Sequence, residues 1–545
     1  MKKNGIILFM LITTVAVLHA QRVHIIPQPI SVKESDGTFD LSYKTSIVFD
    51  KDTRLSAMYF NDYLASFYHF KLKGNNKQNS TNKIVLRLLD NYPDTTFGAY
   101  SLSCSGNNIV ITGKTPEGIF YGIQTLIQLL PVNSNSLNRL LVPGVEIKDA
   151  PRFAYRGMML DVGRHFMPVD FVKKFIDYLA LHKMNTFHWH LTEDQGWRIE
   201  IKKYPRLTQV GAWRNGSVTR TNADPKKWQE VCGRTGGFYT QAEIKDVVKY
   251  AQERYINIIP EIDLPGHSSA AIAAYPQLSC FPDSATEKQR GWCGVDTGKQ
   301  VQQTWGVFKD VYAPTPYTFH FIEDVLNEVM NLFPSKYIHI GGDECPKVYW
   351  KESSYCQDLI KKNNLKNEEG LQSYFIKKVE QYVNSKGKKV IGWDEILEGG
   401  LAPGATVESW RGEEGGVAAA QQKHNVIMSP WGILYLTHPQ SKQEDSVTAG
   451  GYLSISKVYN YDPTGKIDSA YKKYIIGAES CIWTEYMTNP SKVEYMAFPR
   501  MAAASEVFWT KPEEKDYKDF LQRLQTQIQR YQLWNINYSK KYDVE

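Results

Sequence analysis

The sequence contains few of the features that membrane, metal or nucleic-acid binding requires. After residue 20, no apolar run reaches the roughly 20 residues that a membrane-spanning helix needs. No CxxC or HExxH pattern occurs, so the cysteines and histidines lack the usual metal-site spacing. The chain has 64 Lys and Arg against 58 Asp and Glu, and the basic residues are scattered. We therefore expect no transmembrane segment, no metal or other cofactor and no nucleic-acid partner.

Cysteine is scarce as well. The seven cysteines are an odd number, so at least one has no partner within a monomer; they occupy positions 104, 232, 280, 293, 345, 356 and 481. Cys280 and Cys293 are close enough in the sequence to close one loop by a disulfide. Free buried thiols explain these two residues equally well.

The one strongly apolar stretch lies at the N-terminus. Lys2 and Lys3 precede an apolar run over residues 5–18, and Ala20 precedes Gln21. A basic start, a short apolar run and a small residue before the cut are typical of a secretory signal peptide. We expect cleavage within a few positions of residue 20 and an exported protein, periplasmic or secreted. Loss of the two lysines lowers the formal net charge from +6 to +4.

Length and periodicity predict several structural units, because 545 residues exceed what one small core can bury. Before residue 151, short strand-like runs and one helical segment predict a β-sheet with a helix; the runs are 83–89, 100–103 and 108–112, and the helix is 117–130. We divide the chain into a signal peptide (1–20), a small α+β domain (21–150), a repeating α/β domain (151–510) and a C-terminal helical part that packs on it (511–545).

From about residue 155 the chain repeats a short apolar strand, a polar cluster and, in most units, a helical segment. One helix is marked by a capping box at Thr240 and Glu243. Eight such strands predict a (β/α)8 TIM barrel, and an open doubly wound sheet, which normally has fewer units, is the alternative. The predicted strands are 158–162, 186–190, 257–263, 337–340, 389–393, 406–410, 425–429 and 479–483.

Catalytic residues of such barrels gather at the C-terminal ends of the strands. The predicted ends are rich in acids and tryptophan; they carry Asp161, Arg164, His190, Glu193, Asp194, Glu261, Asp263, His267, Asp343, Glu344, Trp393, Asp394, Glu408, Trp410, Trp431, Tyr435, Trp483 and Glu485. Packing explains each residue alone, but it does not explain their occurrence together at one end. Charged groups that bond hydroxyls, with indoles that cover apolar faces, predict a site for a neutral sugar ring.

Two adjacent acids end the fourth predicted strand, in the segment Gly341-Gly342-Asp343-Glu344. Neighbouring side chains of a regular strand point to opposite faces, so both acids face one ligand only where glycines free the backbone. Two carboxyls held that close do not both ionise easily, so one is expected to keep its proton towards neutral pH. Such a pair can protonate a leaving group. A buried helix cap or ion pair is the alternative for this segment taken alone.

With these segments assembled, the chain resembles the family 20 glycoside hydrolases, the exo-acting β-N-acetylhexosaminidases. Six motifs occur in the family's order, and residues 121–126 resemble a helix of its small domain, so the resemblance covers nearly the whole chain after residue 20. The motifs are Arg156-Gly157 with Asp161 to Phe166, His188 to Arg198, Pro260 to His267, His339 to Glu344, Gly392 to Glu395, and Trp483 to Glu485.

The resemblance implies retaining hydrolysis without a protein nucleophile, an exception to the usual scheme of two carboxylates. The substrate's own 2-acetamido oxygen would attack the anomeric carbon and form an oxazolinium-like intermediate. Glu344 would protonate the leaving oxygen and later activate water, and Asp343 would hold the acetamido N–H. Tyr435 would donate its hydroxyl to the acetamido oxygen.

The resemblance also implies binding roles. The substrate is a glycan or glycoconjugate that ends in N-acetyl-β-glucosamine, with N-acetylgalactosamine and 6-sulfated forms left open, as is the oligomeric state. His267, with Glu193 or Asp194 behind it, would tune the proton affinity of Glu344. Arg164 and Glu485 would bind the distal hydroxyls, which makes the enzyme exo-acting. The remaining residues of the substrate-binding set are Trp393, Trp410 and Trp483, which would enclose the N-acetyl methyl group and the sugar face, together with His190 and Asp194.

Two positions depart from the family's pattern. Glu193 stands where many relatives carry Asp, which lengthens the relay to His267 by one methylene. Thr437 stands where the family commonly has Asp or Asn near O4 or O6 of the sugar. This shorter, uncharged side chain leads to the hypothesis that a 6-sulfate, or either configuration at C4, is tolerated.

Two other functions remain open. One is a non-catalytic glycan-binding protein on the same scaffold, although a lectin would have no need of Asp343, Glu344 and Tyr435 together. The other is an ordinary retaining glycosidase that uses Asp343 or another acid as its nucleophile.

Overall fold

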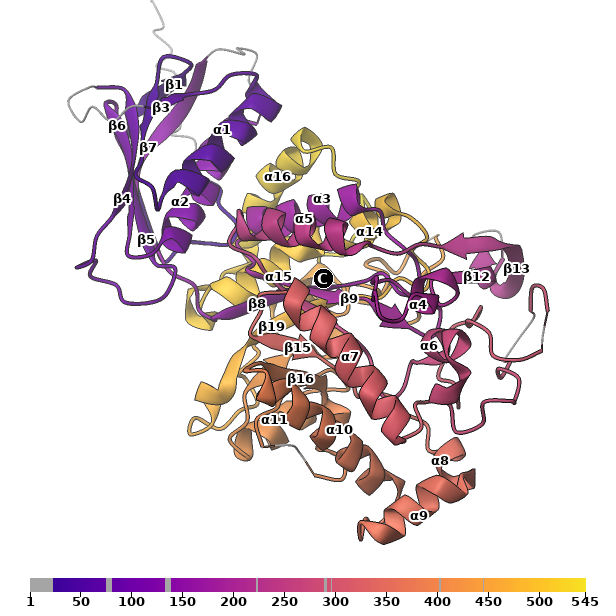
Figure 1. Ribbon diagram of the computed structural model, residues 1–545. Helices are drawn as coiled ribbons and strands as arrows, with labels where there is room; N and C mark the ends of the chain where they lie inside the picture. The colour runs from indigo at the N-terminus through magenta and orange to yellow at the C-terminus, as the bar shows by residue number, and fades with distance from the viewer. Residues whose placement is uncertain are drawn as a thin grey trace, which may run out of the picture.

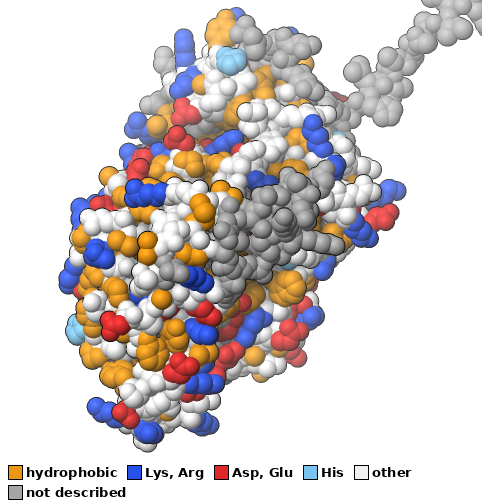
Figure 2. All heavy atoms as spheres, turned by 90° about the vertical axis from the view of Figure 1, so that its right-hand side faces the viewer, with side chains coloured by type: hydrophobic (Ala, Val, Ile, Leu, Met, Phe, Trp, Pro, Cys, Tyr) orange, Lys and Arg blue, Asp and Glu red, His pale blue; other side chains and the backbone are white. Residues whose placement is uncertain are grey.

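The structure, a computed structural model, describes residues 23–74, 81–132, 139–221, 224–288, 292–295, 297–400, 403–444 and 446–545. The predicted signal peptide lies outside these residues. Among the helices of the described part, none combines the length and the apolar character that crossing a bilayer would need. Charges of both signs are interspersed over the face shown in Figure 2, in keeping with their scatter along the sequence.

The N-terminal part forms a seven-stranded sheet whose order is β1-β7-β5-β6-β4-β2-β3. Helices α1 (Arg54–Tyr68) and α2 (Pro116–Leu129) lie on the face of the sheet that turns towards the rest of the molecule (Figure 1). The predicted strands and helix of this region are confirmed to within one or two residues. The strands are β1 (Ser31–Ser42), β2 (Ser46–Val48), β3 (Lys73–Gly74), β4 (Lys83–Leu88), β5 (Tyr100–Cys104), β6 (Asn108–Gly113) and β7 (Arg139–Asp149).

The second part is a closed barrel of eight parallel strands, as predicted, and the alternative of an open sheet is wrong. All eight predicted strands are present, with small differences at their ends. Around the barrel they follow the order β14-β15-β16-β17-β18-β19-β8-β9. The strands are β8 (Tyr155–Asp161), β9 (Thr186–His190), β14 (Asn257–Glu261), β15 (Tyr337–His339), β16 (Lys389–Trp393), β17 (Thr406–Ser409), β18 (Val426–Met428) and β19 (Ile475–Ile482).

Helices surround the barrel, and the connection from β16 to β17 is the short 3-10 helix η2 (Asp394–Leu397) instead. Helix α5 begins where the sequence predicts: both hydrogen bonds of the capping box at Thr240 and Glu243 are present. The helices are α3 (Val169–Leu181), α5 (Gln241–Gln252), α7 (Pro316–Leu332), α10 (Glu368–Ser385), α11 (Glu414–Gln421), α14 (Pro490–Ala497), α15 (Arg500–Trp509) and α16 (Tyr517–Leu533), with shorter segments α4 (Arg206–Gln209), α6 (Ser269–Ala274), α8 (Val348–Glu352), α9 (Ser354–Lys362), α12 (Trp431–Leu434) and α13 (Ile455–Tyr459).

Side chains that point into the barrel form layers, because alternate residues of a strand face the same side. Towards the N-terminal ends of the strands the layer is apolar, and the next layer consists of imidazoles and carboxylates that are fully buried. A third layer, of two aromatic and two sulfur-containing side chains, lies at the C-terminal ends. The layers are Tyr155, Ile259, Ile391 and Ile427; then His188, Glu261, His339, Glu408 and Glu479; then Met159, Trp393, Tyr435 and Cys481.

One disulfide joins Cys232 and Cys293, so the predicted pairing of Cys280 with Cys293 is wrong. The hairpin of β12 (Trp213–Thr221) and β13 (Asp224–Gly236) carries Cys232 to the segment that follows β14. Cys280 turns instead towards Cys356 of α9, with its Sγ 3.8 Å from that of Cys356. Separation along the sequence does not reveal the path of this hairpin.

A buried ion pair joins the two parts of the molecule. Asp149, the last residue of β7, accepts hydrogen bonds from Lys183 Nζ at 2.8 Å and Tyr100 Oη at 2.7 Å. Its other oxygen accepts from Trp509 Nε1 of α15 at 2.8 Å. The side chains of Asp149 and Lys183 are both 0% exposed. The carboxylate therefore depends on donors from both parts.

Replacing Asp149 by alanine should destabilise the whole chain. Removal of one member of a buried pair leaves an uncompensated charge and costs about 3–5 kcal/mol in the free energy of unfolding. The exposed pair of Asp62 and Lys71 offers a matched control, since Asp62→Ala should cost no more than about 1 kcal/mol. Urea unfolding measures both. Equal losses in the two variants would contradict the inference.

Candidate active site

The C-terminal ends of the barrel strands bring the predicted site residues together. Every member of the predicted set lies in the described part of the chain, and each contacts or electrostatically influences another member. The set is Arg164, His190, Glu193, Asp194, His267, Asp343, Glu344, Trp393, Trp410, Tyr435, Trp483 and Glu485.

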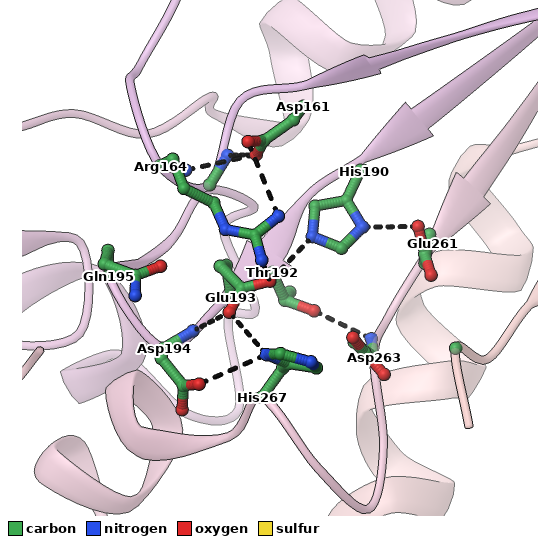
Figure 3. Close-up of polar contacts among 12 residues, drawn as sticks. Asp161, Arg164, His190, Thr192, Glu193, Asp194, Gln195, Glu261, Asp263 and His267 are labelled. Atoms are coloured by element: carbon green, nitrogen blue, oxygen red, sulfur yellow. Dashed lines mark hydrogen bonds and ion pairs between the residues drawn. The ribbon is translucent and has the colours of Figure 1, made fainter. Parts of the chain in front are cut away.

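Glu193 lies at the centre of the polar network (Figure 3). After β9 the chain turns back as a small hairpin, β10 (Thr192–Glu193) and β11 (Gly196–Trp197), which places this carboxylate over the end of the barrel. It accepts from Arg164 Nη2 at 3.0 Å, His190 Nε2 at 3.2 Å and His267 Nδ1 at 2.8 Å. Burial alone would raise its pKa, but the charges of Arg164 and His267 hold the pKa of Glu193 well below its usual range.

His267 connects this network to the acid pair. Its Nδ1 donates to Glu193 and lies 3.2 Å from Asp194 Oδ2. On the opposite side of the ring, Nε2 lies 3.6 Å from both Asp343 Oδ2 and Glu344 Oε2. Burial opposes protonation, but the carboxylates, Glu193 first, raise the pKa of His267 well above its usual range. The imidazole is therefore a cation that faces the acid pair.

The two glycines before the acid pair are required by space and by backbone conformation. Gly341 has φ 66° and Gly342 has φ 95°, and Glu344 itself has φ 43°. A Cβ on Gly341 would lie 1.7 Å from Asp263 Oδ1. The turn places both acids on one side, as predicted: the side chain of Asp343 is 11% exposed and that of Glu344 is 40% exposed.

The proton of the pair belongs to Asp343 in the unliganded protein. Burial, with the charges of Glu261 and Glu344, raises the pKa of Asp343 to about 7 against the opposing effect of His267. The neighbouring imidazolium of His267 lowers the pKa of Glu344, although burial opposes this. The expectation that one of the two acids keeps its proton towards neutral pH therefore applies to Asp343.

Four aromatic side chains form a wall beside the acids. The rings of Trp393 and Trp483 are 5.9 Å apart, and Tyr435 lies 6.3 Å from Trp410 and 6.1 Å from Trp483. Burial raises the pKa of Tyr435 well above its usual range, so its hydroxyl stays neutral and can donate. Thr437 Oγ1 accepts from the backbone N of Trp483 at 3.0 Å, which anchors one indole of the wall.

Several buried polar atoms at the site have no hydrogen-bond partner in the described residues. One of these atoms is Nη1 of Arg164. The Arg164 side chain stacks on Trp483, with its guanidinium carbon 4.8 Å from the ring centroid. Burial raises the pKa of Glu485, against the opposing charge of Arg164. Unmet donors and acceptors side by side suit the hydroxyl and amide groups of a ligand. The atoms are Arg164 Nη1, Asp343 Oδ1, Trp483 Nε1 and Glu485 Oε2.

Imidazoles and carboxylates of the site lie close enough together to hold a cation. In the group around Glu261, the carboxylates raise the pKa of His188 and His190 against the effect of burial, so these two cations already balance the acid; His188 Nε2 lies 3.0 Å from Glu261, and His190 bonds it. The ion pairs account for the arrangement, and we assign no metal role to these residues.

Comparison with known families agrees with this geometry. The model of the catalytic domain of glycosyl hydrolase family 20 matches residues 153–512, and that of domain 2 of the same family matches residues 22–150. The chain belongs to glycosyl hydrolase family 20. The acid pair and the aromatic wall thus lie within the family's catalytic domain.

Relatives within family 20 are similar over most of this chain. A β-hexosaminidase of Porphyromonas gingivalis is 45% identical over 95% of this chain, and one of Vibrio furnissii is 35% identical over 89%. The chain spans 64% of the length of the first relative and 76% of the second. A crystal structure of an exo β-N-acetylglucosaminidase from Vibrio harveyi, in complex with N-acetylglucosamine, is 33% identical with a TM-score of 0.83 and covers 95% of this chain and 78% of its own.

Two residues predicted to bind substrate lie behind the family 20 site. His190 is fully buried, and its two ring nitrogens face Glu193 and Glu261. Asp194 is also buried, and its two oxygens accept from His267 and from the backbone N of Ser269. The polar atoms of His190 and Asp194 are thus already bonded to other protein groups. We therefore interpret both side chains as supports for other site residues.

Three buried acids matter to the site beyond the residues predicted to be catalytic or to bind substrate, although the sequence already places Glu261 and Asp263 at a strand end. Glu261 accepts from Trp393 Nε1 at 3.0 Å, and Glu395 accepts from Trp410 Nε1 at 2.9 Å, so each fixes one indole. Asp263 lies beside His267 and Asp343, with Oδ2 lacking a partner. The sequence signal for all three is an acid at the end of a barrel strand or within two residues after it.

Gly341→Ala should abolish most activity while Gly387→Ala should not. Both glycines have positive φ, 66° and 77°, but a Cβ at Gly387 would meet nothing within 4 Å. The added Cβ at Gly341 displaces Asp263 or the acid pair, and a shift of about 1 Å costs about 100-fold in turnover. Turnover of an aryl N-acetyl-β-glucosaminide and circular dichroism measure both variants. Equal activity in the two would show that the contact does not position the acids.

Proposed function

We propose that the protein is an exo-acting β-N-acetylhexosaminidase that removes terminal N-acetyl-β-D-glucosamine from glycans or glycoconjugates. The observation that carries the proposal is the acid pair Asp343 and Glu344 beside Tyr435 and the indole wall. The names of the relatives, β-hexosaminidases of 45% and 35% identity, support the same substrate class. The alternatives are a glycan-binding protein and a glycosidase with a carboxylate nucleophile.

In the proposed reaction the substrate supplies the nucleophile. The acetamido oxygen attacks the anomeric carbon while the glycosidic bond breaks, and Glu344 gives its proton to the leaving oxygen. Asp343 accepts a hydrogen bond from the acetamido N–H and balances the positive charge of the oxazolinium ring. Tyr435 donates to the acetamido oxygen. Water then attacks the anomeric carbon as Glu344 takes back a proton, and the starting configuration is retained.

The proton of the acid pair changes place when substrate binds. The acetamido N–H needs the carboxylate form of Asp343, whereas the unliganded pair holds its proton there. The proton therefore passes to Glu344, the more exposed of the two, which faces the leaving group. His267, held by Glu193, stabilises whichever of the two acids carries the charge.

The distal end of the sugar sets the exo specificity. Arg164 and Glu485 offer unpaired polar atoms to the hydroxyls at C3, C4 and C6. Thr437 is buried and its hydroxyl accepts a hydrogen bond from the backbone N of Trp483. Its side chain is uncharged, so it places no negative charge at this end of the sugar. We therefore propose that N-acetylgalactosamine and a 6-sulfate are tolerated.

Glu344→Gln should lower turnover by about 100- to 10,000-fold, and the loss should grow as the leaving group becomes poorer, because general acid catalysis matters most there. Aryl glycosides of graded leaving-group pKa measure this. The exposed Glu398→Gln is the control and should stay within about twofold. Unchanged glycan binding with no turnover in the wild type would favour a lectin.

Aryl glycosides with different sugars test whether the substrate supplies the nucleophile and which sugars are accepted. Matched aryl β-glucosides should be hydrolysed far more slowly than N-acetyl-β-glucosaminides; equal rates would contradict substrate assistance. A strong preference for the unsulfated sugar over its 6-O-sulfated form would contradict the inference from Thr437.

Affinity for N-acetylglucosamine should depend on pH differently in two variants. In Glu344→Gln the proton of Asp343 has no acceptor, so affinity should fall by about tenfold for each pH unit below the pKa of Asp343. In the wild type, transfer to Glu344 makes this slope smaller, and in Asp343→Asn affinity should be flat. Calorimetry from pH 5 to pH 8 measures all three. Identical slopes in the wild type and Glu344→Gln would contradict proton transfer.

We also propose that the protein is exported after cleavage near residue 20. The disulfide between Cys232 and Cys293 supports an oxidising compartment. N-terminal sequencing of protein recovered outside the cytoplasm would test this, and an intact Met1 there would contradict cleavage.

A further inference from the structure

Two free thiols that are far apart in the sequence meet beside the site. Cys280 follows the 3-10 helix η1 (Pro276–Leu278), and Cys356 lies in the first turn of α9. Their sulfur atoms are 3.8 Å apart, and both residues are unbonded in this structure. Neither residue belongs to the proposed reaction, so the contact needs an explanation of its own.

The two thiols are held in place by a small apolar cluster separate from the main core. Cys356 is fully buried within it, and Cys280 packs at its edge and is partly exposed. The other buried members are Val311, Cys345, Trp350, Ile360 and Leu371. A reagent in solution can therefore reach Cys280, while Cys356 is positioned to attack it from inside.

We propose that Cys280 and Cys356 are a site of oxidative modification and form a second disulfide by exchange with a small-molecule disulfide such as oxidised glutathione. The distance between the sulfurs must shorten from 3.8 Å to about 2.05 Å, which rotation of the partly exposed Cys280 side chain can supply. The proposal is independent of the proposed function.

The exchange proceeds in two steps that balance. Cys280 loses its proton and attacks one sulfur of oxidised glutathione, which forms a mixed disulfide and releases one glutathione thiolate. Cys356 then loses its proton and attacks the Cys280 sulfur, which forms the protein disulfide and releases the second glutathione. Two protein thiols are oxidised, and one glutathione disulfide is reduced to two thiols.

The surroundings favour Cys356 as the attacking group in the second step. It lies at the N-terminal end of α9, where the partial positive charge of a helix stabilises a thiolate. In the reduced protein a hydrogen bond from the Cys280 thiol lowers the pKa of Cys356 and raises that of Cys280, which burial also raises. Once Cys280 is in the mixed disulfide this hydrogen bond is lost, and the hydrogen bond from Ser353 and the helix end remain to stabilise the Cys356 thiolate against burial.

The second disulfide would fasten the long segment between β14 and α7, residues 262–315, to the chain on both sides. Cys293 of this segment is already bonded to Cys232 of β13. Cys280 would bond it to α9, in the part of the chain that follows Glu344. The two disulfides would then tie this segment at Cys280 and at Cys293, one to the chain after it and one to the chain before it.

Peptide mapping of the full chain tests the proposal directly. The protein is equilibrated at pH 8 with reduced and oxidised glutathione, its remaining thiols are alkylated under denaturing conditions, and the digest is examined without reduction. We expect a peptide pair joined through Cys280 and Cys356 in addition to the pair of Cys232 and Cys293. Alkylation of both Cys280 and Cys356, or a bond from either to Cys345 instead, would overturn the proposal.

Thermal unfolding gives a second measurement with a matched variant. The difference in melting temperature between oxidised and reduced protein should be about 3–6 °C larger in the wild type than in Cys280→Ser, because Cys280→Ser retains only the bond of Cys232 with Cys293. Cys104→Ser, a free cysteine of the N-terminal sheet, should behave as the wild type. An equal difference in the wild type and Cys280→Ser would overturn the proposal.

Discussion

The structure depends on the neutralisation of carboxylates inside a closed barrel. Glu261 is fully buried; it accepts hydrogen bonds from His190 and from the indole of Trp393, and His188 and His339 each lie 3.0 Å from it. A charge in this position is tolerated only when its partners stay within hydrogen-bonding distance. Those partners come from β9, β15 and β16, so the charge fixes the register of several strands at once. The aromatic wall of the site rests directly on this layer.

The site above this layer contains both paired charges and polar atoms that have no hydrogen-bond partner in the described residues. Around Glu193, every charge has a partner, and the group is rigid and closed. One step further out, Arg164 Nη1, Asp343 Oδ1 and Glu485 Oε2 are buried and have no hydrogen-bond partner among the residues that the structure describes. Such atoms reduce stability until a ligand bonds them. The closed network therefore supports the geometry, and the outer atoms are available to hydrogen-bond a ligand.

The sequence predicts the barrel well because each strand is a short apolar run that ends in a polar cluster. It predicts the acid pair for the same reason, since the two glycines mark the turn. It does not reveal which acid keeps the proton, because that depends on Glu261 of β14 and on His267 in the loop that follows β14. The hairpin of β12 and β13 lacks a clear apolar alternation, so the pairing of Cys232 could not be predicted. Strand β1 is mostly exposed and gives an equally weak pattern.

The ion pair at the domain junction has a consequence for dividing the molecule. A barrel expressed without the N-terminal sheet would lose the carboxylate that receives the hydrogen bonds of Lys183 and Trp509. The sheet expressed alone would keep Asp149 at the end of β7 without these two donors. The boundary near residue 150 separates two structural domains. We do not expect the two domains to fold independently of each other. The sheet carries none of the site residues, yet it completes the core on which the barrel stands.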